Sequence, residues 1–423
     1  MPAASSAAAV ADEQFVHLAL RGGIELAAEP LPERAATTLV FRMLSGAADD
    51  PPDLTGISYI VERTLSKGTK RFDGQGLADA FDAIGAQWSG AAGRQSTLVR
   101  VACLPEFTEK AVELVAEMVC HPTLPDEACR VAVDLSLQDL KHLEDDPDAL
   151  LRLEIQRLTL GPVFGRNVGG ELDTLPRVTP DAVRAHWKRG FHSGRLQITA
   201  AGRVDVDALA RRVDRCFAGL GDPARAGREP APVVFTPARS HRDKDLKQQY
   251  IAITLPGVPR EDPRFAIEQV LIGVLSGGMS GRLFTEVREK QGLVYWVGAW
   301  HEQPRGSGII HLGASTTPER CHQTYETLLR ELKRLGEDLS EAEVTRARDQ
   351  LIAQHETEAD LTPARVAGLS EDLFFFSRPV GLAAKLDALR AVKLEQVRDY
   401  AAALPRDRLC VATLGPRKMA NGE

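Results

Sequence analysis

The chain has 423 residues, of which 43% are hydrophobic and 26% are charged, and its formal net charge is -7. This length exceeds one ordinary hydrophobic core and predicts two or more domains, and the composition is typical of a soluble globular protein. The acidic balance, without a block of Lys and Arg, argues against nucleic acid as a general partner. No apolar run reaches the roughly 18 residues that a membrane span needs, so we expect no membrane partner either.

The start of the chain, residues 1–10, is rich in Ala but lacks the basic and long apolar regions of a secretory signal. We therefore expect a cytoplasmic protein, or a periplasmic one if a leader has been removed. The six cysteines are scattered without a C-x-x-C pair. This pattern favours reduced thiols over a disulfide framework or a zinc knuckle.

The first half predicts a mixture of strands and amphipathic helices, because apolar residues recur either in short runs or at spacings of three and four. In chain order, the predicted elements are a strand at 38–43, helices at 56–66 and 74–84, a strand at 96–103, helices at 105–119 and 126–143, and a strand at 196–202.

A Pro-, Arg- and Gly-rich passage, residues 221–240, predicts an exposed linker between domains at 1–220 and 241–423. The second half then repeats the order of the first, which suggests a duplication. We predict two α+β domains, each a mainly antiparallel sheet with helices packed on one side. The predicted elements are a strand at 249–255, helices at 264–275 and 281–291, a strand at 293–300, helices at 318–335 and 340–357, and a strand at 409–414.

Residues 58–63 have the layout of a zinc-peptidase helix without its histidines. An H-x-x-E-H helix places two imidazoles one turn apart and uses the glutamate to activate a zinc-bound water. Here Tyr59 and Arg63 occupy the histidine positions, and Glu62 keeps the glutamate position. A guanidinium does not lose its proton in a protein and repels a cation. We therefore expect no metal in this chain.

The sequence resembles the pitrilysin and mitochondrial-processing-peptidase-like family of zinc peptidases, in its bacterial branch of short subunits. Residues 56–69 are similar to the family pattern G-x-x-H-x-x-E-H-x-x-x-K-G-T, and residues 277–295 match G-G-M-S-S-R-L-F-x-E-[IV]-R-E-x-x-G-L-x-Y almost throughout. The resemblance covers most of the chain. It implies that the third zinc ligand, a glutamate, is replaced here by Asp139.

This loss of ligands leaves two interpretations of the degenerate metal site. In the first, Arg63 fills the former metal position as a buried cation and pairs with Asp139 or Glu62. In the second, these side chains are ordinary solvated charges on helices. The neighbouring strand, residues 85–92, also departs from the family pattern, because small side chains replace those that would contact a substrate.

Arg288 and Tyr295 match a family pair with the same spacing of seven residues. The resemblance implies that the phenol donates to the scissile carbonyl and that the guanidinium holds the substrate backbone. We expect Gly292 to end the helix that carries Arg288, since glycine tolerates the left-handed conformation. The alternative is an Arg on a solvated helix face and a Tyr in the core.

A glycine-rich turn precedes this pair in the sequence. Gly277, Gly278 and Ser280 lie where related non-catalytic subunits carry a loop implicated in substrate handling, so the resemblance implies that they bind substrate. A tight turn without any substrate role is the alternative, because glycine-rich sequences often form such turns.

The resemblance implies a chain that is inactive alone and needs no cofactor of its own. Its partner would be a homologous subunit with an intact H-x-x-E-H motif and zinc, and the pair would cut peptides or unfolded segments. This chain would supply Arg288 and Tyr295 in trans. The alternatives are a catalytically silent assembly subunit and, third, a self-sufficient enzyme that uses Glu62 with an unconventional metal.

Overall fold

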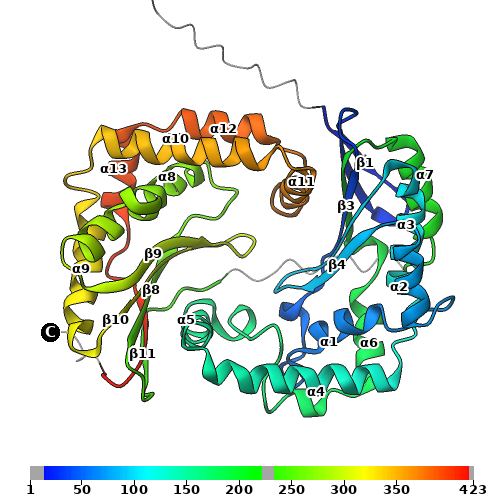
Figure 1. The fold of residues 1–423 in the computed structure, drawn as a ribbon, viewed down its shortest axis with the longest axis horizontal. Helices are drawn as coiled ribbons and strands as arrows, with labels where there is room; N and C mark the ends of the chain where they lie inside the picture. Colours follow the sequence, from blue (N-terminus) through cyan, green and yellow to red (C-terminus); the bar gives the residue numbers. More distant parts are fainter. Residues whose placement is uncertain (1–13, 222–232, 419–423) are drawn as a thin grey trace, which may run out of the picture.

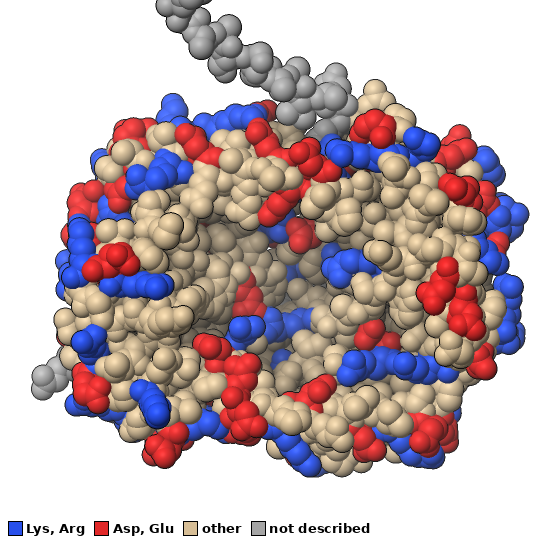
Figure 2. All heavy atoms as spheres, viewed as in Figure 1, with Lys and Arg blue, Asp and Glu red and all other residues tan. Residues whose placement is uncertain are grey.

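The computed structural model describes residues 14–221 and 233–418. The Ala-rich start and most of the predicted linker therefore lie outside the described residues. The chain forms a six-stranded and a five-stranded sheet on opposite sides of the molecule (Figure 1). The surface between the two halves is hollowed, and Lys or Arg and Asp or Glu side chains of both signs surround the hollow (Figure 2).

The two sheets repeat one strand order. The first runs β1-β2-β6-β3-β5-β4 and the second runs β7-β11-β8-β10-β9, so the orders correspond strand for strand once β1 is set aside. In both sheets one pair is parallel, β2 with β6 and β7 with β11, and the other pairs are antiparallel. The predicted α+β class with mainly antiparallel sheets is confirmed. The strands are β1 Val16–Ala19, β2 Glu25–Pro30, β3 Thr37–Met43, β4 Gln87–Ala92, β5 Thr97–Cys103, β6 Leu196–Gly202, β7 Ala238–Arg242, β8 Gln249–Gly257, β9 Val294–Glu302, β10 Gly308–Thr316 and β11 Cys410–Leu414.

The helices follow the predicted ranges closely, and further helices occur at positions for which the sequence analysis made no prediction. The helices of the first half are α1 Ile57–Leu65, α2 Gly74–Asp82, α3 Thr108–Cys120, α4 Asp126–His142, α5 Pro147–Phe164, α6 Pro180–Gly190 and α7 Val206–Cys216. Those of the second half are α8 Phe265–Ser276, the π-helix η9 Leu283–Glu289, α9 Cys321–Arg334, α10 Glu341–Glu358, α11 Thr362–Phe376, α12 Leu382–Arg390 and α13 Leu394–Ala403.

Short polar side chains explain where several of these helices begin. Asp73 accepts a hydrogen bond from the Gly76 amide at 2.7 Å at the start of α2. Ser340 and Glu343 form a capping box at the start of α10. Such caps satisfy amides that have no partner within the helix.

The side chains of strand β3 pack into two different hydrophobic clusters, one on each face of the sheet. The seven residues of β3 are all buried. Leu39 and Phe41 belong to the main core under the helices of the first half, whereas Val40 packs with Val366 of α11. Because successive strand residues point to opposite faces, a strand that is buried along its whole length indicates a sheet covered on both sides.

Each sheet is covered on its second face by a helix from the other half. The helix α11 packs on β6 and β3 of the first sheet, and α5 packs on β8 and β11 of the second (Figure 1). Gln197 of β6 donates to the Leu373 carbonyl of α11 at 3.1 Å, and the hydroxyls of Thr159 in α5 and Thr254 in β8 are 2.7 Å apart. The helices predicted on one side of each sheet are thus joined by a helix from the other half, which covers the second face.

None of the helices in the described part of the chain combines the length and the apolar composition that crossing a membrane would require.

The packing of α11 on the sheet of the first half can be tested by its contribution to stability. Leu373 is fully buried in the contact with Ala27 of β2, whereas Leu361, the residue that precedes the helix, is 63% exposed. We expect Leu373→Ala to lower the free energy of unfolding by about 2–5 kcal/mol, because it removes buried apolar atoms and leaves a cavity. Chemical denaturation followed by circular dichroism measures this loss. Leu361→Ala is the matched control, and equal effects of the two substitutions would contradict the exchange.

Candidate functional site

Tyr59 and Arg63 lie together on one face of α1, as their spacing predicted. The Arg63 guanidinium carbon is 5.1 Å from the centre of the Tyr59 ring. Across the packing of α1 on α4, the guanidinium Nη2 lies 3.7 Å from Asp139 Oδ2. The Arg63 and Asp139 side chains are 39% and 64% exposed, so water screens this pair and its contribution to stability is small. Arg63 thus has a carboxylate partner, but it is not the buried cation that the first interpretation described.

Glu62 lies against the neighbouring sheet edge. A Cβ added to Gly90 of β4 would be 2.1 Å from Glu62 Oε1, so the absent side chain of Gly90 makes room for this carboxylate. Burial raises the pKa of Glu62, while the charges of Arg63 and Lys67 act to lower it. The glycine at position 90 of β4 is therefore explained by its packing against Glu62.

The residues at this place do not fit a zinc ion. Zinc is bound in proteins by thiolates, neutral imidazoles and carboxylates. The former histidine positions hold a phenol and a guanidinium, and the nearby carboxylate of Asp139 is already paired with that guanidinium. Across residues 14–221 and 233–418, no group of three or more His, Cys, Asp or Glu side chains could hold a metal ion.

Arg288 lies on a helix of unusual hydrogen bonding. Residues Leu283–Glu289 form a π-helix, and the Lys290 amide continues its pattern by bonding to the Thr285 carbonyl at 3.0 Å. Gly292 has a φ of +58° and donates to the Arg288 carbonyl at 3.0 Å, so it ends the helix as predicted. Short π-helical turns are rare and frequently lie at functional sites.

Tyr295 is displaced from the regular strand by a β-bulge. In the pairing of β9 with β10, Val294 lies opposite Thr316 and Trp296 lies opposite Ser315, so Tyr295 is the extra residue. Its side chain is 74% exposed, which contradicts the alternative of a core tyrosine. A bulge locally turns a strand and re-aims a side chain. The regular alternation of side chains along a strand is therefore broken at this residue.

Arg288 and Tyr295 are in contact with each other. The guanidinium carbon of Arg288 lies 5.6 Å from the centre of the Tyr295 ring and 5.0 Å from that of Phe284. This cation–π contact holds the long Arg side chain beside the phenol. The structure thus brings together the two residues that the sequence selected, on η9 and at the start of β9.

A cleft of about 770 Å³ opens beside Tyr295, between α5 and the second sheet. It has the size and the largely apolar lining of ligand-binding clefts. The sequence analysis did not select its other residues, although three aromatic residues within the short segment 295–300 were a usable signal. Besides Tyr295, the residues that line the cleft include Leu151, Ile155 and Gln156 of α5, Tyr250 of β8, Trp296, Trp300 and Glu302 of β9, and His311 and Gly313 of β10.

The glycine-rich turn is packed tightly at its start. A Cβ on Gly277 would be 2.4 Å from the Gly273 carbonyl oxygen, and Gly278 has a φ of +74°. Gly277 is therefore explained by close packing of the backbone, and Gly278 by its left-handed conformation. Gly278, Met279 and Ser280 are exposed, so the turn reaches solvent. The predicted substrate role of Gly277, Gly278 and Ser280 stays a prediction.

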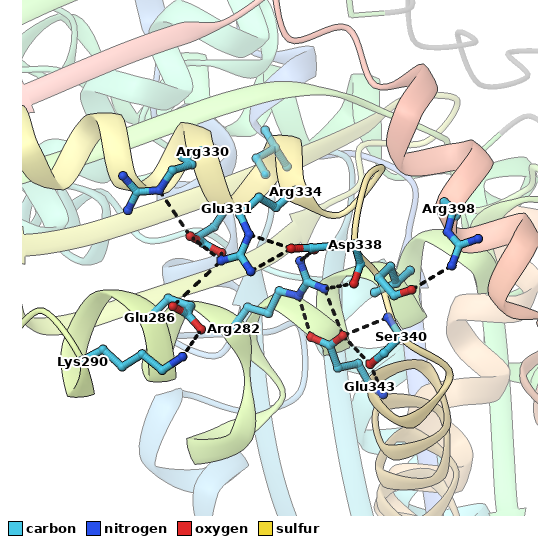
Figure 3. Close-up of polar contacts among 12 residues, drawn as sticks. Arg282, Glu286, Lys290, Arg330, Glu331, Arg334, Asp338, Ser340, Glu343 and Arg398 are labelled. Atoms are coloured by element: carbon cyan, nitrogen blue, oxygen red, sulfur yellow. Dashed lines mark hydrogen bonds and ion pairs between the residues drawn. The ribbon is translucent and has the colours of Figure 1, made fainter.

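Arg282, within the matched segment 277–295, anchors the π-helix to the first turn of α10 and to the loop before it. Its Nε lies 2.6 Å from Glu343 Oε1, its Nη2 lies 3.0 Å from Glu343 Oε2, and its Nη1 lies 2.7 Å from Asp338 Oδ1 (Figure 3). Arg334 of α9 bonds to the other oxygen of Asp338 at 2.8 Å. Burial acts to raise the pKa of Glu343, but hydrogen bonds from Arg282 and Ser340 outweigh it and lower the pKa to about 2.

A duplicated α+β chain with a peptidase-like helix, and with an exposed Tyr295 beside the partly buried Arg288, is typical of pitrilysin-type peptidases. The family models agree with this class. Residues 26–161 match the model of insulinase, peptidase family M16, and residues 177–351 match that of the peptidase M16 inactive domain. The chain belongs to the M16 peptidase family.

Bacterial relatives extend the likeness over nearly the whole chain. An uncharacterized zinc protease of Streptomyces coelicolor is 27% identical over 94% of this chain and 89% of its own length, and one of Bacillus subtilis is 24% identical over 94% and 97%. The crystal structure of a peptidase M16 inactive domain from Pseudomonas fluorescens has a TM-score of 0.88 at 19% identity, covering 96% of this chain and 99% of its own. A protease from Helicobacter pylori has a TM-score of 0.85 at 15% identity, covering 96% and 100%. These structures share the fold.

The degenerate helix predicts a gain of metal binding on substitution. We expect the isolated chain to hold no stoichiometric zinc after dialysis, because Arg63 places a fixed positive charge at the site. Tyr59→His combined with Arg63→His supplies two imidazoles one turn apart near Asp139, a donor set that binds about one zinc ion. Metal analysis and calorimetry compare these proteins. Tyr59→Phe with Arg63→Leu is the control that removes the charge without adding ligands, and zinc in the unaltered chain would refute the prediction.

The Arg282 network predicts a second, structural effect. Arg282→Met leaves Glu343 and Asp338 without their shared cation, and we expect a loss of about 2–3 kcal/mol in the free energy of unfolding at neutral pH, reduced by partial solvent screening. Lys290→Met is the matched control, since its ion pair with Glu286 lies on the surface. An equal effect of the two substitutions in denaturant titrations would contradict the anchoring role.

The same network predicts an acid dependence. The pKa of Glu343 falls from its ordinary value of 4.5 to about 2 in the folded chain. A lowered carboxyl pKa stabilises the fold fully above pH 4.5, and this stabilisation is lost as the pH falls toward 2. In Arg282→Met this part of the acid dependence should shrink, as measured by unfolding at a series of pH values.

Proposed function

We propose that this chain is the metal-free subunit of a heterodimeric zinc metallopeptidase that cuts peptides or unfolded segments. A homologous partner with an intact H-x-x-E-H motif would supply the zinc, its ligands and the general base. The observation that carries the proposal is the exposed phenol of Tyr295 on its β-bulge, with Arg288 beside it. A side chain placed in this way is available to a second molecule.

The chemistry of this pair fits amide hydrolysis. As a hydroxide attacks a peptide carbonyl, negative charge develops on the carbonyl oxygen. A preorganised donor aimed at this oxygen contributes about 2.7–4 kcal/mol to catalysis. In the proposed arrangement the Tyr295 phenol donates this hydrogen bond, and the Arg288 guanidinium donates to a carbonyl of the substrate backbone.

The edge of the second sheet supports peptides as the substrate class. In the strand order, β9 is an end strand, so one side of it carries no neighbouring strand within its sheet. An extended peptide can add to such an edge through backbone hydrogen bonds, largely independent of its sequence. We also propose a reducing compartment, the cytoplasm, since all six cysteines are free thiols.

A catalytically silent assembly subunit is the second candidate. Several residues of the matched segment 277–295 have a role within the fold, such as the ion pairs of Arg282 and the close packing of Gly277, and such roles favour a silent subunit. Those roles do not extend to Tyr295, which is largely exposed on its bulge. A self-sufficient enzyme based on Glu62 is disfavoured by the donor set around Arg63.

The test is coexpression with an H-x-x-E-H homologue encoded beside this chain. We expect Tyr295→Phe to lower kcat of the mixed complex about 10²–10³-fold without changing assembly, because it removes only the donor to the oxyanion. Peptide hydrolysis and size-exclusion chromatography measure the two effects. Tyr325→Phe is the control, since this phenol lies on α9 and pairs with Arg239 instead. Unchanged turnover of Tyr295→Phe would defeat the assigned role and favour the silent subunit.

A further inference from the structure

The cleft beside Tyr295 exists because α5 covers only part of the second sheet. The helix packs on β8 and β11, and the adjoining face of β9 and β10 is left open beside it. Leu151 and Ile155 of α5 form an apolar wall, and strands β8, β9 and β10 form the floor. Tyr295 belongs to the lining of the cleft, so the cleft adjoins the residue proposed to act on the peptide bond.

Two tryptophans present their rings on this floor. The ring centres of Trp296 and Trp300 are 6.0 Å apart, and Trp300 stacks on His311 at 5.2 Å with an interplanar angle of 12°. A Cβ on Gly313 would be 2.9 Å from Trp296 Cζ3 and 3.0 Å from Trp300 Cη2, so the missing side chain lets both rings lie down on β10. The tryptophans are nevertheless 45% and 37% exposed. Adjacent exposed aromatic rings in a cleft are typical of binding sites.

The charges in the cleft are already balanced. Glu302 forms an ion pair with Arg94, from the loop that joins β4 to β5, and its Oε2 lies 3.0 Å from His311 Nε2. Burial acts to raise the pKa of Glu302, but His311 and Arg94 outweigh it and lower the pKa. Asp148 and Arg152 of α5 add one charge of each sign to the lining. The lining therefore favours a neutral, apolar group over a charged one.

We propose that this cleft is a side-chain pocket that binds an aromatic or large aliphatic residue of an extended peptide. The peptide backbone follows β9, and the bound side chain lies on Trp296 and Trp300. The pocket's volume of about 770 Å³ accommodates one large side chain with its adjoining backbone. That the bound residue lies beside the bond to be cut rests on the function proposed above for Tyr295, whereas binding itself does not.

The test uses the full chain alone, without a catalytic partner. Three fluorescently labelled peptides, identical except for Phe, Lys or Ser at one central position, are titrated with the chain and followed by anisotropy. We expect the Phe peptide to bind at least about tenfold more tightly than the Ser peptide, an advantage of about 1.4 kcal/mol, and the Lys peptide to resemble the Ser peptide. Trp296→Ala and Trp300→Ala should abolish the preference for Phe. Trp187→Phe, on α6, is the control that should retain it.

A second measurement avoids any substitution in the cleft. Trp296 and Trp300 are two of the four tryptophans, so replacing Trp88 and Trp187 by Phe leaves only the cleft to emit. We expect the unlabelled Phe peptide to change this emission with the same affinity as in the anisotropy titration. An unchanged emission, equal affinities for the three peptides, or a preference for Lys would overturn the proposal. Self-association that requires Trp296, without a preference for Phe, would assign the surface to a second copy and overturn it as well.

These outcomes are independent of the catalytic test. Binding with a preference for Phe, together with unchanged turnover of Tyr295→Phe, would retain the pocket and reject the catalytic role. Equal binding of the three peptides, together with reduced turnover, would do the reverse.

Discussion

The exchange of α5 and α11 between the halves is the constraint on which the rest of the structure depends. Each helix buries the second face of the other half's sheet, and the buried contacts of Leu373 and Thr159 cross between the halves. Neither sheet can keep that face dry alone, because exposed apolar strands cost free energy in water. The same exchange positions the cleft, since α5 stops short of β9 and β10 and leaves their aromatic face open.

The two halves have diverged in what they present to a ligand. At the first, Arg63 and Asp139 form a screened ion pair where a metal helix would carry histidines, and Glu62 packs over Gly90. At the second, a bulge and a π-helix direct Tyr295 outward with Arg288 against it. One half therefore offers no donor set for zinc, while the other offers an exposed phenol with a guanidinium beside it. The division of labour with a zinc-bearing homologue that we propose would account for both observations.

Much of the fold could be predicted because apolar periodicity reports the local element and its buried face. The strand at 293–300 and the helix at 126–143 lie where the sequence indicated, and Gly292 ends its helix for the expected reason. The exposure of Tyr295 could not be predicted, because a bulge depends on the register of β9 against β10. The role of Arg282 was also missed, since Asp338 and Glu343 lie far along the chain.

By itself, the sequence determined the family, the duplicated order of elements, the loss of the histidines at Tyr59 and Arg63, and the choice of Arg288 and Tyr295. These follow from residue identity and local spacing, which need no partner. Only the tertiary structure decided that Arg63 meets Asp139, that helices cross between the halves, and that Trp296 and Trp300 lie on Gly313 beside Tyr295. Such contacts join residues from different elements, and their geometry depends on how sheets and helices pack rather than on any one segment.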